Sequence, residues 1–294
     1  MSRDTVQQRR TILSCCYAIR PVTGRPGAHA RTTPGTAPTN CNKSGDMPKT
    51  PRQDRRHFVK LCASSAAAVV ASPEGLAGLI SEGILYQRVQ LLDEHGNTLA
   101  ASSLATNENY LFFYPFVATP CFLIRLDRPV IGSATLRTEN GRPYHWPGGT
   151  GPDRSIVSFS AICAHKMSHP SSQVSFINYR PEEVQFAGSD QRFQRRAGVI
   201  YCCSEGSVYD PAQGARVLGG PAPQPLAAIL LEYEPASDAL FAVGVAGQPM
   251  FGRYFEQFWH RLQLEFRTEA IRQPVEGGSR VTPLSSYCNK QVLC

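Results

Sequence analysis

From Ser81 to about residue 248 the chain alternates short apolar runs with turn sequences, and this alternation limits the folds that it can adopt. The runs are rich in β-branched and aromatic residues, for example "ILYQRVQLLD", "CFLIRL", "SIVSFSAI" and "AAILLEYE". Turns such as "DEHGN", "TENGRP" and "DPAQGA" separate them. Such runs between Gly, Pro, Asn and Asp are typical of strands. Many short strands at this spacing predict an all-β domain over residues 81–248.

The hydrophobic period changes after Pro249. The next apolar residues fall at helical spacing, namely Phe251, Tyr254, Phe255, Phe258, Trp259 and Leu262. They form one stripe of an amphipathic helix. We expect this helix to open a C-terminal part, residues 249–294, and to dock on the β domain. The alternative is that the stripe contacts a partner protein or a membrane surface.

The positive charge of the chain is concentrated at its N-terminus. The formal net charge is +7, and residues 1–60 hold nine Arg and three Lys against three Asp and no Glu, a local net of +9. The remainder is therefore close to neutral. A basic N-terminal segment ahead of a neutral body argues for targeting, and we expect no nucleic-acid partner.

The N-terminal segment contains a motif of export signals. Residues 1–46 show no hydrophobic period and predict disorder; our hypothesis is that translation begins at Met47 and that these residues extend the gene model. Residues 47–72 resemble a twin-arginine (Tat) signal peptide, whose R-R-x-F-x-K core matches Arg55, Arg56, Phe58 and Lys60. The resemblance implies Tat export of a folded, cofactor-loaded protein to the periplasm. A basic linker before an Ala-rich helix, and an uncleaved membrane anchor through Ile80, are the alternatives.

Two short segments in the β region carry metal-binding residue types. "SAICAHKMSHP" contains Cys163 and His165 directly after a predicted strand, and "YCCSEGSVYDP" contains Cys202 and Glu205. Thiolate and imidazole donors suit iron–sulfur clusters or zinc. A zinc site is the weaker alternative.

The second segment, followed by "GARVLGGPAPQPL", resembles the second half of a Rieske domain, C-P-C-H-G-S-x-Y-D and then G-P-A-P-x-P-L. The resemblance covers roughly residues 110–245. It implies a Rieske-like antiparallel β domain with two cluster-binding loops and a [2Fe–2S] cluster. In this register the metal ligands are Cys163, His165, Cys202 and Glu205, with Glu205 at the position of the family's second histidine.

The resemblance implies roles for further residues. Ser207 would donate to a bridging sulfide, Tyr209 would donate to a ligand cysteine sulfur, and Gly220 and Pro221 would belong to the proline-rich loop that covers the cluster. The family often links its two loops by a disulfide, but this chain has Ser168 and Ser204 at those positions.

Three interpretations of Glu205 remain open from the sequence. Its carboxylate completes the ligand set, or His169 or Cys203 takes the missing position, or the domain has lost its cluster. The long stretch between His165 and Cys202 predicts an added hairpin. Near the C-terminus, Cys288 and Cys294 either form a small disulfide loop or stay free.

These features together predict a Rieske-type [2Fe–2S] electron-transfer protein or a redox subunit of an exported oxidoreductase. Such a protein works with a redox partner protein or within a larger complex and has no catalytic site of its own. About 50 residues follow the β domain in this sequence, fewer than the catalytic domain of a Rieske oxygenase has, so we do not expect an oxygenase catalytic subunit. The alternative function is a Rieske-fold module without a cluster that serves binding or structure.

Overall fold

The computed structural model describes residues 83–294. The predicted signal peptide and the 46 residues before it lie outside this range. Within it, no helix is both long and apolar enough to span a membrane.

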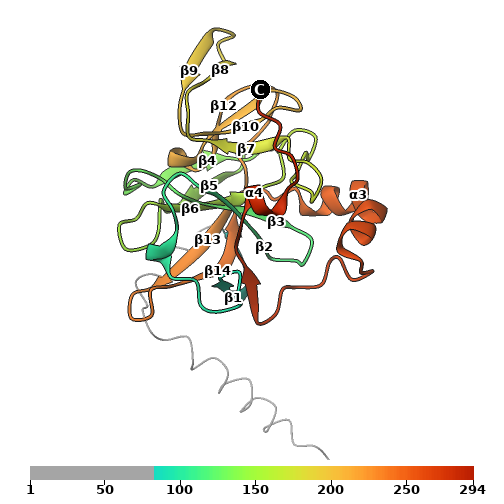
Figure 1. The fold of residues 1–294 in the computed structure, drawn as a ribbon. Coiled ribbons are helices and arrows are strands. Elements are labelled where there is room, and N and C mark those ends of the chain that lie inside the picture. The colour runs from blue at the N-terminus through green and yellow to red at the C-terminus, as the bar shows by residue number, and fades with distance from the viewer. Residues whose placement is uncertain (1–82) are drawn as a thin grey trace, which may run out of the picture. The chain divides into compact units, whose positions relative to one another are not determined.

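The largest element of the fold is an eight-stranded sheet (Figure 1). Its neighbouring strands pair antiparallel except for the first two, which are parallel. In spatial order the strands are β15 (Gly278–Arg280), β1 (Gly83–Leu92), β14 (Ala239–Ala246), β13 (Ala228–Glu234), β6 (Ile156–Ser160), β3 (Pro120–Arg125), β2 (Asn109–Phe113) and β16 (Thr282–Pro283). The predicted all-β architecture is confirmed.

A smaller antiparallel sheet carries the second cysteine segment. Its order is β12 (Arg216–Gly219), β11 (Ser207–Asp210), β10 (Val199–Cys202) and β7 (Ile177–Arg180). Two hairpins accompany it, formed by β4 (Ala134–Arg137) with β5 (Pro143–Trp146) and by β8 (Val184–Ala187) with β9 (Phe193–Arg196). The β8–β9 hairpin lies between the two cysteine segments, so the predicted added hairpin is confirmed.

The central strands of the large sheet are buried on both faces. Along β3, Cys121 and Leu123 belong to one apolar cluster, and Phe122 and Ile124 belong to another. Side chains of a strand alternate between faces, so these clusters lie on opposite sides of the sheet. The first cluster includes residues of the C-terminal helix, and the second includes residues of β7, β10 and β11. Burial on both faces explains the unbroken apolar sequence of β3.

Helix α3 (Phe251–Phe266) docks on the domain as predicted. Phe251, Tyr254, Phe255 and Leu262 are buried in the first cluster. The stripe is not buried throughout, because Trp259 is 36% exposed and lies beneath the Arg272 guanidinium, 5.5 Å from its ring centroid.

The segment after α3 is also part of the β domain. β15 and β16 add the two edges of the eight-stranded sheet, and the short helix α4 (Leu284–Tyr287) buries Leu284. Strands of two or three residues are too short to show a hydrophobic period, which is why only a helix and a tail were predicted there.

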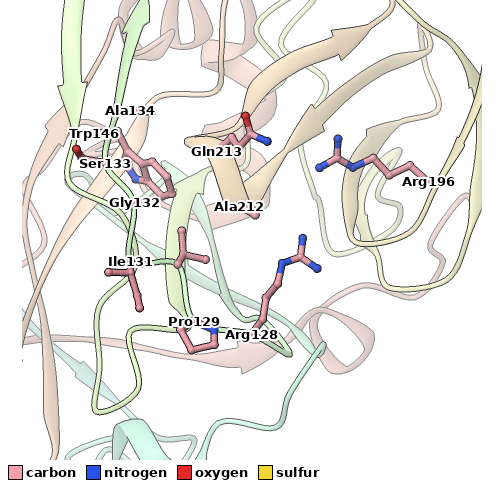
Figure 2. Close-up of a pocket in the computed structure, with 11 residues that line it drawn as sticks. Arg128, Pro129, Ile131, Gly132, Ser133, Ala134, Trp146, Arg196, Ala212 and Gln213 are labelled. Carbon is pink, nitrogen blue, oxygen red and sulfur yellow. The ribbon is translucent and has the colours of Figure 1, made fainter.

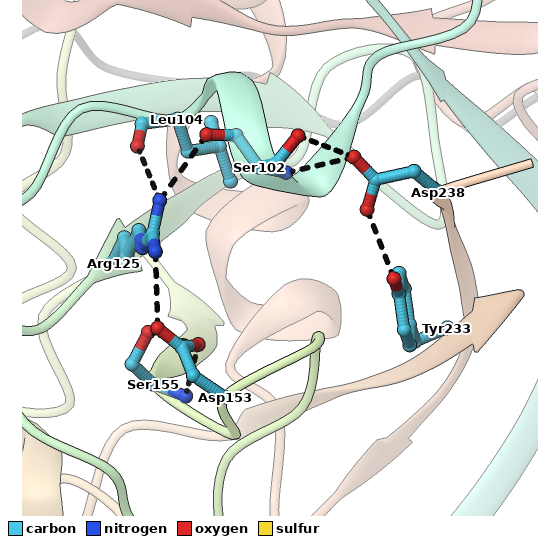
Figure 3. A network of polar contacts seen from close by, with 7 residues as sticks. All are labelled: Ser102, Leu104, Arg125, Asp153, Ser155, Tyr233 and Asp238. Atoms are coloured by element: carbon cyan, nitrogen blue, oxygen red, sulfur yellow. Dashed lines mark hydrogen bonds and ion pairs between the residues drawn. The ribbon is translucent and has the colours of Figure 1, made fainter. Parts of the chain in front are cut away.

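Polar contacts fix the turn of the 3-10 helix η1 (Ala101–Ser103) to neighbouring turns (Figure 3). Arg125, at the end of β3, donates to the backbone carbonyl of Ser102 at 3.2 Å and to the carboxylate of Asp153 at 3.0 Å. Asp238, in the β13–β14 turn, accepts from the Ser102 backbone N–H at 3.1 Å. The network therefore anchors one loop to both the β3 and β13–β14 regions.

His169 packs against α3. Its ring lies 4.8 Å from the ring centroids of both Tyr254 and Phe258, and Nδ1 lies 2.8 Å from the carbonyl oxygen of Met167. Burial lowers the pKa of His169 from 6.5 to about 4; the Met167 carbonyl opposes this shift, and the Arg261 charge adds to it.

We predict that the free energy of unfolding falls as the pH is lowered, because His169 is protonated more readily in the unfolded state. The folded state holds neutral His169, whereas the unfolded state protonates it below pH ~6.5, so its contribution is complete above that pH. The contribution is lost as pH falls toward 4, by up to about 3 kcal/mol in the free energy of unfolding. His169→Phe should flatten this slope in denaturant titrations between pH 4 and 6.5. An unchanged slope would contradict the assignment.

Candidate metal centre

The first predicted ligand loop is a tight turn that follows β6. The Cys163 N–H donates to the Ser168 carbonyl at 2.9 Å, and the Met167 N–H donates to the Cys163 carbonyl at 3.0 Å. Cys163 is 1% exposed, whereas His165 is half-buried and Lys166 is exposed. The turn therefore holds the thiol inside the fold and carries the imidazole at its edge.

The second predicted ligand loop joins β10 to β11. Cys202 ends β10 and pairs with Ser207, the first residue of β11, while the Gly206 N–H donates to the Cys202 carbonyl at 2.9 Å. Gly206 has φ +76°, a conformation that glycine adopts without strain. Cys202 and Ser207 are both fully buried.

The Tyr209 hydroxyl connects the two loops. It lies 3.2 Å from the Cys163 sulfur and 3.2 Å from the backbone nitrogen of Ala164. The Ala164 N–H donates to the hydroxyl oxygen, which leaves the hydroxyl proton free for the sulfur. The Tyr209 hydroxyl therefore contacts the Cys163 sulfur, the cysteine that the resemblance proposes as a ligand.

The two cysteines influence each other's ionisation. Hydrogen bonding with the neighbouring Cys202 thiol is the largest cause that lowers the pKa of Cys163 below its ordinary value; the Tyr209 hydroxyl acts in the same direction, and burial opposes both. The same interaction with Cys163, followed by burial, raises the pKa of Cys202. Two buried thiols that favour one thiolate are suited to binding a cation, which would favour deprotonation of both.

Two polar atoms at the site have no hydrogen-bond partner. His165 Nδ1 and the Ser207 hydroxyl are both buried and unpaired. An unpaired buried polar group is costly and calls for an explanation, such as an ion that binds there. Both atoms belong to residues that the resemblance assigns to the cluster.

Glu205 is turned toward the surface. Its carboxylate accepts from the Lys166 ammonium at 2.9 Å, and its side chain is 31% exposed. This ion pair is the largest cause that holds the pKa of Glu205 below its ordinary value. Within residues 83–294, no three or more His, Cys, Asp or Glu side chains are arranged to hold a metal ion. The two loops therefore offer two thiols and one imidazole of the types that an iron–sulfur cluster uses, but these side chains are not gathered as a metal site. The Glu205 carboxylate is engaged by Lys166.

The two other proposed donors are engaged elsewhere. Cys203 forms a disulfide with Cys294, so it has no thiolate to offer while the disulfide is intact. His169 packs against α3, as described above. Neither alternative for the C-terminal cysteines holds for both residues: Cys288 is a free, buried thiol, and Cys294 pairs with Cys203.

The disulfide ends a segment that we call the C-terminal strap, residues 289–294. The strap follows the chain between the two ligand loops: the Asn289 N–H donates to the Ser172 carbonyl at 2.9 Å, and the Val292 N–H donates to the Ser175 carbonyl at 2.8 Å. At its end, the Cys294 carbonyl accepts from the Arg180 guanidinium at 3.1 Å. These long-range contacts explain why Cys294 pairs with a cysteine 91 positions away.

The predicted covering loop contacts the second ligand loop through glycines. A Cβ on Gly220 would collide with the Gly206 carbonyl oxygen, and Gly220 has φ +80°. A Cβ on Gly219 would collide with the carbonyl oxygen of Ala187 in the β8–β9 hairpin. The added hairpin, the covering loop and the ligand loop therefore form one continuous run of close backbone contacts.

No family model matches the chain. Among solved structures, the chain is similar to the crystal structure of the soluble domain of the Rieske protein II (soxF) from Sulfolobus acidocaldarius. The two are 23% identical, with a TM-score of 0.37, and the match covers 54% of this chain and 78% of that one. Support for a function therefore comes from the geometry of the two loops.

We predict that breaking the Cys203–Cys294 disulfide destabilises the protein. A crosslink over such a long loop restricts the unfolded chain, so Cys294→Ser should lower the free energy of unfolding by about 2–4 kcal/mol. Denaturant titrations with and without a reductant would measure this: the parent protein should respond to the reductant, whereas Cys294→Ser should not.

Cys288→Ser is the matched control. Its hydroxyl can keep the contact to the Lys290 carbonyl that the Cys288 thiol makes at 3.2 Å, and the variant should still respond to the reductant. A parent protein whose stability ignores the reductant would contradict the prediction.

Proposed function

We propose that this chain is a Rieske-type [2Fe–2S] electron-transfer protein, or a redox subunit of an exported oxidoreductase. The observation that carries the proposal is the arrangement around the two buried cysteines. Cys163 and Cys202 come from different loops and interact with each other, and the Tyr209 hydroxyl contacts one of their sulfurs. The unpaired His165 Nδ1 and Ser207 hydroxyl belong to the same two loops.

In this proposal Cys163 and Cys202 would hold one iron, and His165 with Glu205 would hold the other. When bound, such a cluster supplies the transfer of one electron at a time. To serve as a ligand, the Glu205 carboxylate would have to give up its ion pair with Lys166, whose ammonium would remain nearby as a compensating charge. The carboxylate brings a negative charge where an imidazole would be neutral, so it favours the oxidised state.

Tyr209 and Ser207 act in the opposite direction. A hydroxyl that donates to sulfur stabilises the reduced, more negative state and raises the reduction potential. Tyr209 is well suited to this role because it is fully buried and its oxygen is oriented by the Ala164 N–H. Gly220 and Pro221 belong to the loop that restricts water at the site.

We propose that the protein is exported to the periplasm through the signal at residues 47–72 and passes electrons to or from a partner protein. The motif around Arg55 and Arg56 supports this part of the proposal. A fusion of residues 47–80 to a reporter that is exported only when folded would test this part. We expect the reporter to be exported, and we expect export to be lost when both arginines are replaced by lysine. Export that is indifferent to this change would contradict it.

Electron paramagnetic resonance tests the central proposal. The full chain, expressed with cluster-assembly machinery and reduced with dithionite, should give a rhombic signal with a low average g value. Iron and acid-labile sulfide should be present in equal amounts. Colourless protein without iron would instead favour the cluster-free binding or structural module.

We predict that Glu205→His raises the reduction potential, because a neutral imidazole replaces an anionic donor. The parent should lie at or below the lower end of the ~−150 to +300 mV span of Rieske centres, and the variant should move into this span. Redox titration followed by the same signal measures the change. Glu183→His is the matched control, since Glu183 also lies near a basic partner, Arg195, 3.9 Å away. Equal potentials for parent and Glu205→His would contradict the assigned role.

We predict that Tyr209→Phe lowers the potential and costs about 1–3 kcal/mol of stability, because the buried Ala164 N–H loses its acceptor. Redox and denaturant titrations would measure the two effects. Tyr144→Phe is the control: its hydroxyl is buried in the same apolar cluster but has no partner, so its loss should leave the potential unchanged. A shift of the same size in both variants would contradict a specific contact.

A further inference from the structure

A pocket outside the cysteine site lies between the β3–β4 connection and the turn after β11 (Figure 2). Its volume is about 370 Å³, within the lower part of the range for sites that bind small molecules. Residues 128–134 form one side, and Ala212 and Gln213 of the 3-10 helix η2 (Pro211–Gln213) form another. Trp146, at the end of β5, and Arg196, at the end of β9, complete it.

Arg196 is held at the pocket by a buried carboxylate. Its guanidinium donates to Asp210, which is fully buried, and the second oxygen of Asp210 accepts from the Ala212 N–H. Among the described residues, Asp210 is the one acceptor of the Arg196 side chain, so N–H groups of the guanidinium are left over. The side chain remains 33% exposed. The arginine is therefore fixed in place with donors still available.

Arg128 supplies a second guanidinium. Its side chain is 60% exposed, and its nearest acidic partner, Asp127, is a loose contact at 3.8 Å. None of the residues that line the pocket is acidic. Asp210 is already paired with Arg196, and Asp127 does not line the pocket. Figure 2 shows both guanidinium groups on the same side of the pocket as Ala212. Asp210 neutralises Arg196, so the positive charge of the lining that is not closely paired comes from Arg128.

The rest of the lining is largely apolar. Pro129, Val130, Ile131 and Ala134 line it together with Trp146, whose side chain is almost completely buried. Ile131 is 69% exposed at the rim. An inorganic anion would satisfy the arginines but leave this apolar surface wet, whereas an apolar body on the anion would cover it.

We propose that this pocket binds a small organic carboxylate with an apolar or aromatic body. The planar fork of an arginine matches the two oxygens of a carboxylate. The apolar body lies along the 129–134 segment and Trp146. This site shares no residue with the cysteine site, so its test does not depend on whether a cluster is bound.

Benzoate is the probe, titrated into the full chain by calorimetry or by NMR of the indole and arginine side-chain signals. We expect a dissociation constant in the millimolar range, as is usual for so small a ligand at an open site. Arg128→Gln should weaken binding about tenfold through the loss of one charged donor. Arg196→Lys keeps the charge beside Asp210 but loses the fork, and it should weaken binding several-fold.

Arg195→Gln is the matched control, because Arg195 neighbours Arg196 on the same strand without lining the pocket; it should bind benzoate as the parent does. Benzyl alcohol, which lacks the charge, and inorganic phosphate, which lacks the apolar body, should both bind more weakly than benzoate. Absence of benzoate binding, equal binding of phosphate and benzoate, or an equal loss in all three variants would overturn the proposal. If Arg196→Lys fails to fold, the comparison of benzoate affinity between Arg128→Gln and Arg195→Gln is sufficient to decide the question.

Discussion

Two buried cysteine thiols lie beside each other at the meeting point of the two sheets, and the rest of the domain holds them there. Cys163 follows β6 of the large sheet, and Cys202 ends β10 of the small one. Neither thiol is exposed to solvent, and their interaction lowers the pKa of one while raising that of the other. A cation bound beside these sulfurs would favour the thiolate form of both cysteines. The proposed cluster would supply this positive charge, and the Tyr209 hydroxyl would donate a hydrogen bond to the Cys163 sulfur.

The loops that carry these thiols are held together without a disulfide between them. Ser168 and Ser204 stand at the positions where the Rieske domains that the sequence resembles often have that link. Here the C-terminal strap runs beside the segment between the loops and ends in a disulfide at Cys203, the residue next to Cys202. The glycine contacts of the covering loop add a second restraint from the side of the β8–β9 hairpin. The C-terminal strap and the β8–β9 hairpin therefore hold the two loops in place from outside the loops themselves.

Local patterns were sufficient to predict much of the fold. The alternation of strand-like runs and turns predicted the β domain, the helical stripe predicted α3, and the long gap between the ligand segments predicted the β8–β9 hairpin. What the sequence could not supply was long-range pairing. β15 and β16 are too short to show a period, and only the folded path of the strap brings Cys294 to Cys203. The Lys166–Glu205 ion pair joins two loops whose proximity depends on both sheets. The sequence could therefore single out Glu205 as unusual, while its present partner needed the structure.

The central claim is that the two cysteines hold one iron while His165 and Glu205 hold the other. Mössbauer spectroscopy of the full chain enriched in iron-57 tests this claim most directly, because it distinguishes irons by their ligands. The account predicts two equally populated iron sites in the oxidised protein, one typical of sulfur ligands alone and the other shifted by nitrogen and oxygen donors. Two identical iron sites, or protein that retains no iron, would contradict it.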